Sequence, residues 1–290
     1  MLNESRILTC SPFTFHITTQ HRNVVENLER IYGDRVTSPH EYDGFIDYRV
    51  GVTHSGGLRR IFADQSRFTC DKLEPFKPLN KSQAFAMLEW GLNWVVAAHE
   101  VSHLIIHSAV LAKNGKAILF PAPPGSGKST LTAFLSRNGW QLLSDEMALI
   151  TPMSLKVTPF VRPICLKNKS IELVKEWYPN ATFSSVARDT HKGDVIHMSP
   201  DNKSIEMQHQ AAEIAGIVFP KYTSNIFCDV FSLDNATAYT QLSENAFNYS
   251  VLQGKGVKSL LNIVEQVPSF EVAYNSLEEL SSFLDDEVLR

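Results

Sequence analysis

The chain has 290 residues, of which 43% are hydrophobic and 20% are charged, and its formal net charge at pH 7 is −4. A chain of this length can bury a substantial core, in one large domain or in one domain with a smaller companion. Because basic residues are not in excess, nucleic acid is not expected as a partner.

The cysteines are far apart in the sequence and form no CxxC pair: Cys10, Cys70, Cys165 and Cys228. This spacing argues against a zinc site and against a disulfide scaffold, and it fits a reducing compartment. No apolar run is long enough to cross a bilayer, and the N-terminus has no apolar stretch of signal-peptide length. We therefore expect a cytoplasmic protein without a membrane span.

The first 80 residues have the pattern of a small α+β unit. Alternating apolar positions predict three strands: Phe13–Thr18, Phe45–Val52 and Arg60–Phe68. Helical spacing of apolar residues marks Asn23–Tyr32, and the prolines of Pro75–Pro78 indicate a linker. The predicted domains are therefore a small unit at 1–80 and a main domain at 81–290.

The main domain begins with a strongly apolar stretch, Gln83–Ala98, which predicts a buried helix. A buried strand is expected at Ser102–Leu111. Asn114-Gly115 then favours a tight hairpin turn into a second apolar strand, Ala117–Phe120. These two strands should therefore pair antiparallel.

A phosphate-binding loop follows directly, at Ala122–Thr130 (APPGSGKST). It fits the pattern G-x-x-x-x-G-K-[ST], with Ala122 in place of the first glycine. The glycines let the backbone curl around an anion, and the N-terminus of the following helix, predicted at Ser129–Ser136, favours negative charge. Lys128 should reach the outer phosphates of a nucleotide, and the Ser129 hydroxyl should hold Mg²⁺. The residues expected to bind the phosphates are Pro124, Gly125, Ser126, Gly127, Lys128, Ser129 and Thr130.

An acidic pair, Asp145-Glu146, ends the next short strand, Trp140–Leu143. A carboxylate at this edge, beside a phosphate loop, can help to hold Mg²⁺ or accept a proton from an attacking hydroxyl. The candidate metal ligands are Ser129, Asp145 and Glu146. The alternative is a solvated pair of acids at a strand end.

His107 lies midway along the predicted strand Ser102–Leu111, among apolar neighbours. A histidine there could contact the reacting phosphoryl group or orient the acid. A hydrogen-bonded core histidine explains the same pattern, and the residues alone leave both interpretations open.

The rest of the chain predicts further alternating strands and helices. Strands are expected at Met147–Thr151, Ile214–Pro220, Ile226–Leu233 and Ser269–Tyr274. Helices are expected at Ile171–Trp177, Ala246–Gln253, Val257–Val267 and 277–288. Two polar, turn-rich stretches are expected to be loops: Pro159–Asn168 and Ala187–Pro200.

Three stretches around these motifs, His107–Leu111, Ile118–Leu131 and Gly139–Ile150, resemble the HPr kinase/phosphorylase superfamily. The chain is most similar to the HprK-related kinase A group of bacterial proteins. That group shares FxxLEWGLNW, RPxxLKN and KGxxxHM, which match Phe85–Trp94, Arg162–Asn168 and Lys192–Met198 here. The resemblance covers nearly the whole chain and is most specific over residues 83–200.

The resemblance implies a mixed α+β fold of the α/β class: a P-loop kinase of the HPr kinase and phosphoenolpyruvate carboxykinase type, with a small N-terminal α+β unit. It implies that His107 and Asp145 lie at the phosphoryl-transfer centre. The superfamily pair is often Asp-Asp where this chain has Asp145-Glu146, and the glycine- and arginine-rich second signature of true HPr kinases is absent. The substrate HPr and the reverse phosphorolysis are therefore not carried over, and homo-oligomerisation is left open.

Phosphoryl transfer also needs cations around the equatorial oxygens. Arg162 is a candidate catalytic cation, because it follows soon after the strand that bears Asp145. Lys167, Lys192 and His197 are candidates for contacts to substrate or phosphate. Solvated surface charge is the alternative for each of these residues.

The leading hypothesis is an ATP- and Mg²⁺-dependent kinase. Its acceptor would be a hydroxyl of a protein Ser or Thr, or of a small alcohol or sugar. The alternative is a nucleotide-binding switch or scaffold without phosphotransfer, in which residues 1–80 dock a partner. A transport or remodelling ATPase has less support, because no arginine-finger motif or second nucleotide site is visible.

Overall fold

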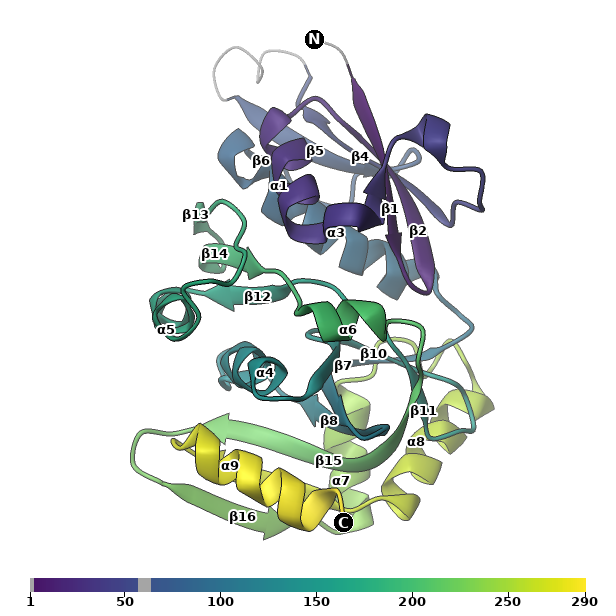
Figure 1. Ribbon diagram of the computed structural model, residues 1–290. Helices are drawn as coiled ribbons and strands as arrows, with labels where there is room; N and C mark the ends of the chain where they lie inside the picture. Colours follow the sequence, from purple (N-terminus) through teal and green to yellow (C-terminus); the bar gives the residue numbers. More distant parts are fainter. Residues whose placement is uncertain (1–2, 57–63) are drawn as a thin grey trace. The chain divides into compact units, whose positions relative to one another are not determined.

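The computed structural model describes residues 3–56 and 64–290, and shows a mixed α+β chain that divides into two compact units (Figure 1). Unit 1 comprises Met1–His99 and Pro163–Ser199, and unit 2 comprises Glu100–Arg162 and Pro200–Arg290. This division differs from the boundary expected at residue 80. The helix after that boundary packs with unit 1, and a later segment of the chain returns to it.

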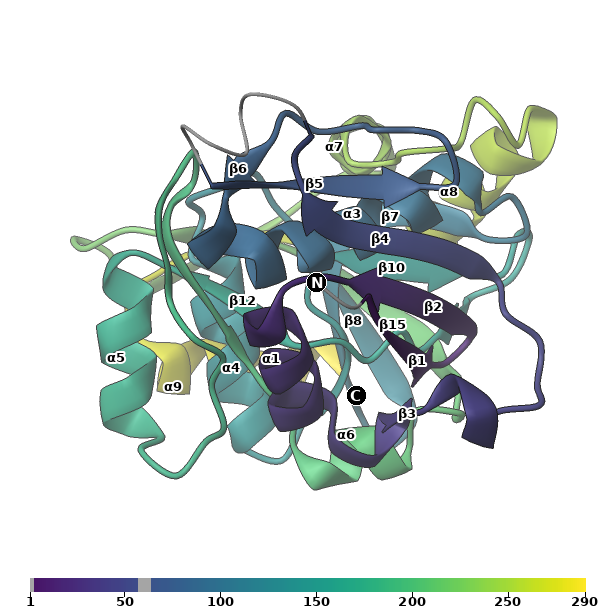
Figure 2. The same cartoon turned by 90° about the horizontal axis from the view of Figure 1, so that it is seen from above.

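Unit 1 is built on a six-stranded sheet of order β3-β1-β2-β4-β5-β6. Its strands are β1 (Glu4–Cys10), β2 (Phe13–Thr19), β3 (Val36–Thr37), β4 (Tyr48–His54), β5 (Gln65–Cys70) and β6 (Leu79–Asn80). The helices of this part are α1 (Arg22–Tyr32) and α3 (Ala84–His99). Figure 2 shows β1, β2, β4 and β5 from above. The predicted strand Arg60–Phe68 corresponds to β5, and its residues 60–63 lie outside the described residues.

Helix α3 confirms the buried helix expected at Gln83–Ala98. Most of its residues are buried, and the ring of Phe68 on β5 fills the space that a side chain at Gly91 would need. A helix that is apolar on nearly every side is stable only when it is covered on nearly every side. This packing places α3 in unit 1, beyond the linker that Pro75–Pro78 predicted.

The segment 163–199 forms a second, three-stranded sheet in unit 1, of order β12-β14-β13. Its elements are β12 (Ile164–Lys167), α5 (Lys169–Trp177), β13 (Ala187–Thr190) and β14 (Gly193–Met198). The expectation of loops at Pro159–Asn168 and Ala187–Pro200 was therefore wrong in part. The polar stretch makes a hairpin because its apolar residues, such as Val195 and Met198, are buried against the unit.

Hydrogen bonds over long sequence separations hold this segment to the N-terminal part. The Ser185 amide donates to Asn27 Oδ1 (2.7 Å), and the Ser199 hydroxyl donates to the carbonyl of Ile31 (2.9 Å). The side-chain amide of Gln83 donates to the carbonyl of Arg188 (2.7 Å). These bonds connect the segment to residues of the N-terminal part of unit 1.

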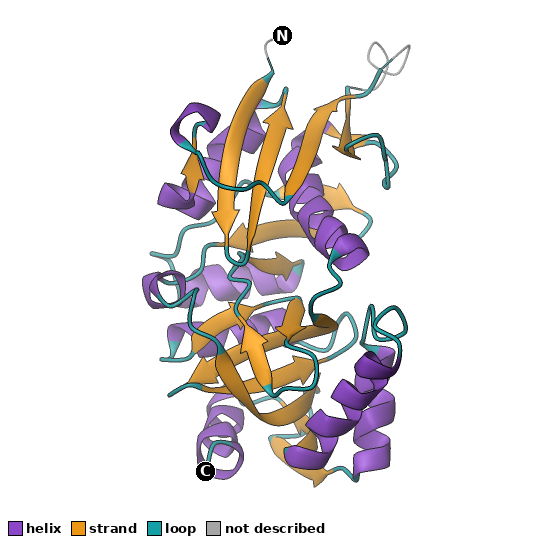
Figure 3. Cartoon of the chain, turned by 90° about the vertical axis from the view of Figure 1, so that its right-hand side faces the viewer, coloured by secondary structure: helices purple, strands orange, loops and turns teal. Residues whose placement is uncertain are grey.

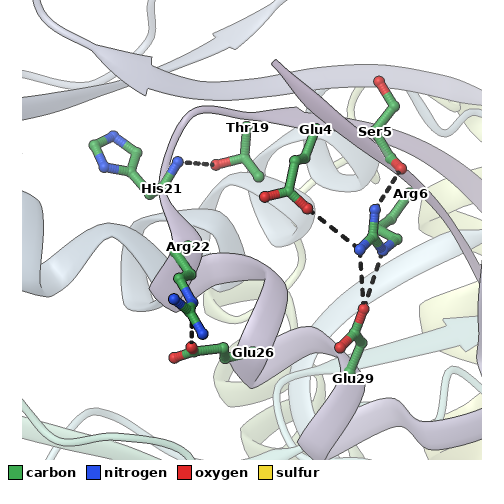
Figure 4. A network of polar contacts seen from close by, with 8 residues as sticks. All are labelled: Glu4, Ser5, Arg6, Thr19, His21, Arg22, Glu26 and Glu29. Atoms are coloured by element: carbon green, nitrogen blue, oxygen red, sulfur yellow. Dashed lines mark hydrogen bonds and ion pairs between the residues drawn. The ribbon is translucent and has the colours of Figure 1, made fainter. Parts of the chain in front are cut away.

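One end of the first sheet carries a polar network (Figure 4). Arg6 pairs with Glu29 (3.0 Å), and Arg22 pairs with Glu26 (2.8 Å). These pairs are exposed, so each contributes at most about 1 kcal/mol. The buried His21 donates its amide to Thr19 Oγ1 (3.1 Å), which fixes the chain at the start of α1.

The His21 ring gives unit 1 a pH-dependent stability. It lies 4.3 Å from the His54 ring between centroids, and burial, followed by repulsion from a charged His54, lowers the pKa of His21 below 6.5. The folded chain then binds fewer protons than the unfolded chain, so stability is full above pH 6.5 and falls as the pH drops below it. We expect denaturant unfolding at pH 5 and pH 8 to show this loss, and His21→Gln to reduce it. The exposed His40 supplies the control, since His40→Gln should leave the pH dependence as it is.

Unit 2 is built on an eight-stranded sheet; Figure 3 draws all strands of the chain in orange. Its main order is β11-β10-β7-β8-β15-β17-β16, and β9 also pairs with β7. The strands are β7 (Leu104–Lys113), β8 (Lys116–Pro121), β9 (Gln141–Ser144), β10 (Met147–Ile150), β11 (Lys156–Thr158), β15 (Ala212–Tyr222), β16 (Cys228–Ser232) and β17 (Ser269–Tyr274). The helices are α4 (Lys128–Arg137), α6 (Asn202–Glu206), α7 (Asn235–Glu244), α8 (Gly254–Gln266) and α9 (Leu277–Phe283), and a π-helical turn, Leu284–Val288, follows α9.

The hairpin expected at Asn114-Gly115 is confirmed. Both residues have positive φ, at 54° and 78°, and β7 and β8 pair antiparallel around them. Beyond β8, the strands β15 and β17 run parallel to it. The strand that leads into the phosphate loop is therefore central, with antiparallel β7 on one side and parallel β15 on the other.

Residues 246–253 do not form the helix that their apolar spacing predicted. Ala246 makes a bridge to Ile106, and the Phe247 amide donates to the carbonyl of Ile105 (2.9 Å). Asn248 Oδ1 accepts from the Ile105 amide (2.8 Å). Residues 246–248 therefore lie against β7, whereas Leu252 and Gln253 donate their amides within the turns that follow, to the carbonyls of Asn248 (3.0 Å) and Ser250 (3.2 Å). Among the described residues, no helix is both long and apolar enough to span a membrane.

Candidate functional site

The phosphate-loop motif lies between β8 and α4, as its sequence predicts (Figure 1). Gly125 and Gly127 have φ of 90° and 89°, a conformation that costs other residues about 1–2 kcal/mol. Helix α4 begins at Lys128, and its first turn closes when the Leu131 amide donates to the carbonyl of Gly127 (3.0 Å). The first-turn amides before Leu131 have no intrahelical acceptor, so this end of α4 suits an anion.

One residue of the loop departs from the expected cradle. The Ser126 amide donates to the carbonyl of Pro123 (3.3 Å), so this amide closes the turn. The Ser126 hydroxyl is buried and has no hydrogen-bond partner among the described residues. A buried hydroxyl of this kind is usually satisfied by a ligand or by water, so the loop fits a bound phosphate chain.

The second glycine of the loop has no room for a side chain. A Cβ atom on Gly127 would lie 3.0 Å from both Tyr222 Cβ and the Tyr274 hydroxyl. Gly139, after α4, has the same backbone conformation (φ 91°) but nothing within 4 Å of such a Cβ. An alanine at either position would adopt the same unfavourable backbone conformation. Only at Gly127, in the loop, would its Cβ also meet neighbouring side chains.

We expect Gly127→Ala to weaken binding of MgATP at least tenfold, because the loop must shift away from both tyrosines. Gly139→Ala is the matched control: it should cost about 1–2 kcal/mol of stability and leave nucleotide affinity within twofold. Calorimetric titration together with thermal unfolding separates the two effects. Equal losses of affinity in both variants would contradict the role assigned to the loop.

Lys128 and His107 are in contact at the start of α4. Lys128 Nζ lies 3.2 Å from His107 Nε2. Because an ammonium group only donates, a hydrogen bond between these two atoms uses the imidazole nitrogen as the acceptor. His107 therefore lies beside the residue that should bind the outer phosphates, and its expected contact with the phosphoryl group or with the acid stays a prediction.

Asp145 projects from a break between two short strands. β9 and β10 both run antiparallel to β7, and β9 ends before Asp145 while β10 begins after Glu146. The Met147 amide donates to the Ser144 hydroxyl (2.9 Å), and the Ser108 amide donates to the Glu146 carbonyl (3.2 Å), so the break has a fixed shape.

The break brings the acid to the loop. Asp145 Oδ2 accepts a hydrogen bond from the Ser129 hydroxyl (3.2 Å), and Asp145 is 3% exposed. A hydroxyl and a carboxylate oxygen this close are the hard oxygen donors that Mg²⁺ prefers. Two of the three predicted metal ligands therefore adjoin. The third, Glu146, is held at the same break through its carbonyl.

Arg162 ends the first of the two chain segments of unit 2 and is buried. The Phe160 amide donates to the carbonyl of Leu143 (2.8 Å), which places this segment alongside β9, two residues before Asp145. The guanidinium lies 5.3 Å from the centroid of the Phe160 ring. Arg162 is thus near the strand that bears the acid, and its contact with a phosphoryl group stays a prediction.

The other three predicted cations belong to unit 1, so the site described here, within unit 2, does not include them. Lys192 lies over the Trp90 ring (5.1 Å), and His197 is buried with its ring edge against Phe85 (5.5 Å). Lys167 ends β12, where its amide donates to the Ser170 hydroxyl (2.9 Å). Their roles in substrate binding stay predictions.

Phe247 is a residue of the site that sequence reasoning missed. Its ring stacks on His107, with centroids 5.8 Å apart and an interplanar angle of 25°, and the side chain is 51% exposed. Its place was hidden because residues 246–253 were interpreted as a helix. The sequence does hold one indication of a turn here: Asn245 and Asn248 flank Phe247 closely, and asparagine favours turns.

Among residues 3–56 and 64–290, no group of three or more His, Cys, Asp or Glu side chains has the arrangement of a metal centre. Comparison with known proteins gives no match to a protein-family model and no match to a curated protein.

Proposed function

We propose that this chain is an ATP-dependent kinase of the phosphate-loop type, related to the HPr kinase superfamily that it resembles. One observation carries the proposal: four side chains, Lys128, His107, Ser129 and Asp145, adjoin in two contacts of 3.2 Å at the start of α4. A cation, an imidazole, a hydroxyl and a carboxylate at a helix N-terminus are groups that can serve phosphoryl transfer.

The phosphate chain of ATP would lie against the loop. Backbone amides of the first turn of α4 donate to its oxygens, and the Ser126 hydroxyl gains a partner. Lys128 exchanges its contact with His107 for the outer phosphates, since an ammonium group next to a phosphate oxygen forms a stronger, charge-assisted bond. Once Lys128 has left it, His107 can carry a proton on Nε2 and donate from that nitrogen to an oxygen of the terminal phosphoryl group.

Ser129 and Asp145 would hold Mg²⁺, which when bound neutralises charge that develops on the phosphate oxygens. Asp145 has a second role, because its carboxylate can accept the proton of an acceptor hydroxyl. The acceptor oxygen attacks the γ-phosphorus, the new O–P bond forms as the bond to the bridging oxygen breaks, and ADP leaves. The proton ends on Asp145, so charge and atoms balance.

The acceptor is proposed as a class: an alcohol, on a protein Ser or Thr or on a small molecule. The test measures ADP formation and transfer of label from γ-labelled ATP, with and without cell extract as a source of acceptor. Turnover that depends on the extract, with label on a stable phosphoester, supports the kinase. Slow ADP formation that is the same without extract would instead indicate a nucleotide-binding switch.

A further inference from the structure

Tyr222 is a fixed and exposed aromatic residue beside the phosphate loop. It ends β15, and its side chain is 56% exposed. Its amide donates to the carbonyl of Ser126 (3.0 Å), and its Cβ borders Gly127. The loop at Ser126 and Gly127 is therefore bound to the end of β15, and the Tyr222 ring lies beside this contact.

The ring of Tyr274 packs against the ring of Tyr222. The two residues pair in the parallel ladder of β15 and β17, and their rings meet edge to face with centroids 6.0 Å apart. Tyr274 is buried, and burial raises the pKa of its hydroxyl above the ordinary value, so it stays neutral. The Tyr222 ring thus contacts Tyr274, while a large part of the Tyr222 side chain is exposed to solvent.

The reacting groups lie on the other side of the central strand. His107 is on β7, and Asp145 follows β9, which pairs with β7, whereas Tyr222 ends β15, which pairs with the opposite edge of β8. A nucleoside triphosphate whose terminal phosphate faces His107 and Asp145 has its base at the far end of the phosphate chain. The exposed aromatic ring on that far side suits a base, because every base has an apolar face that stacks on aromatic side chains.

We propose that the exposed ring of Tyr222 is the surface on which the nucleotide base stacks, so that the site takes a nucleoside triphosphate in preference to a bare polyphosphate chain. The inference rests on the proposed function, because it assumes that the loop binds phosphates. It adds a binding residue and the part of the ligand that this residue recognises.

The test compares MgATP with Mg²⁺-tripolyphosphate as ligands of the full chain, by calorimetric titration. Tyr222→Ala removes the ring and keeps both the amide and the Cβ that borders Gly127. It should weaken MgATP about tenfold, the lower part of the range for stacking on one aromatic ring, and change tripolyphosphate less than twofold. Tyr222→Phe keeps the ring and should bind both ligands as the wild type does. Phe231→Ala is the control, because Phe231 on β16 is similarly exposed (58%) and is paired with Glu271, away from the loop.

Each outcome decides the inference. A loss for MgATP alone supports base stacking. Equal losses for both ligands would show that Tyr222 only shapes the phosphate loop, and unchanged affinity for both would show that the base lies elsewhere; either result overturns the inference and leaves the proposed kinase intact. If the wild type binds neither ligand, the proposed function fails and the inference fails with it.

Discussion

Replacement of Lys128 by methionine is expected to weaken MgATP binding by on the order of a hundredfold. In the proposed complex the ammonium group supplies charge-assisted bonds to the outer phosphates, and methionine keeps most of the length of the side chain without the charge. Lys128 is 9% exposed and contacts His107, so the variant also removes a positive charge from a buried place and should not unfold the chain. Equilibrium dialysis with labelled ATP gives the affinity.

Lys258→Met is the matched control for that measurement. Lys258 is an exposed residue on α8, in the same unit, and its replacement should leave the affinity within twofold. Thermal unfolding of both variants confirms that they fold. An Lys128→Met chain that folds and binds MgATP as tightly as the wild type would refute the assignment of the loop.

Asp145→Asn is expected to separate binding from transfer. The loop amides and Lys128 still bind the phosphates, and the amide oxygen of asparagine can still face Mg²⁺, so MgATP affinity should change by less than about threefold. The asparagine side chain cannot take the proton of an attacking hydroxyl, and loss of a general base slows such reactions about 10²–10⁴-fold. Single-turnover transfer of labelled phosphate to an acceptor in cell extract measures the effect.

Asp229→Asn supplies the control for the acid, because Asp229 is exposed on the edge strand β16. It should transfer at the wild-type rate. Unchanged transfer by Asp145→Asn would mean that the carboxylate neither accepts the proton nor places the acceptor. A parallel loss of binding and transfer would assign Asp145 to Mg²⁺ alone.

The parts of the site that the sequence predicts well depend on short-range rules. Gly125 and Gly127 adopt positive φ, and Asn114-Gly115 turns β7 into β8, because the local residues leave the backbone few alternatives. Once that hairpin forms, His107 is only one strand away from the loop. The contact between Lys128 and His107 itself was not predicted from the sequence and is seen only in the structure.

The parts that the sequence does not predict depend on distant partners. The segment 163–199 joins unit 1 through bonds such as that between Ser185 and Asn27, which are 158 residues apart. No local pattern marks that pairing, so a boundary at residue 80 and a polar loop at Ala187–Pro200 were the natural interpretations. Lys192 and His197 lie in that segment and therefore belong to unit 1.

Residues 246–253 show a different limit. Their apolar residues recur at helical spacing, but Ile105 accepts from one backbone group of this segment and donates to the side chain of Asn248. A spacing of three or four residues does not distinguish a helix from an irregular segment that lies along a strand. Phe247 was missed for this reason, and its stacking on His107 became visible only in the fold.

The most direct test of the account is a calorimetric titration of the wild-type chain with ATP in the presence of Mg²⁺. The account predicts a heat of association that saturates at one nucleotide per chain and that disappears in Lys128→Met. A titration that produces no heat of association, matched by equilibrium dialysis in which labelled ATP is not retained, would contradict it.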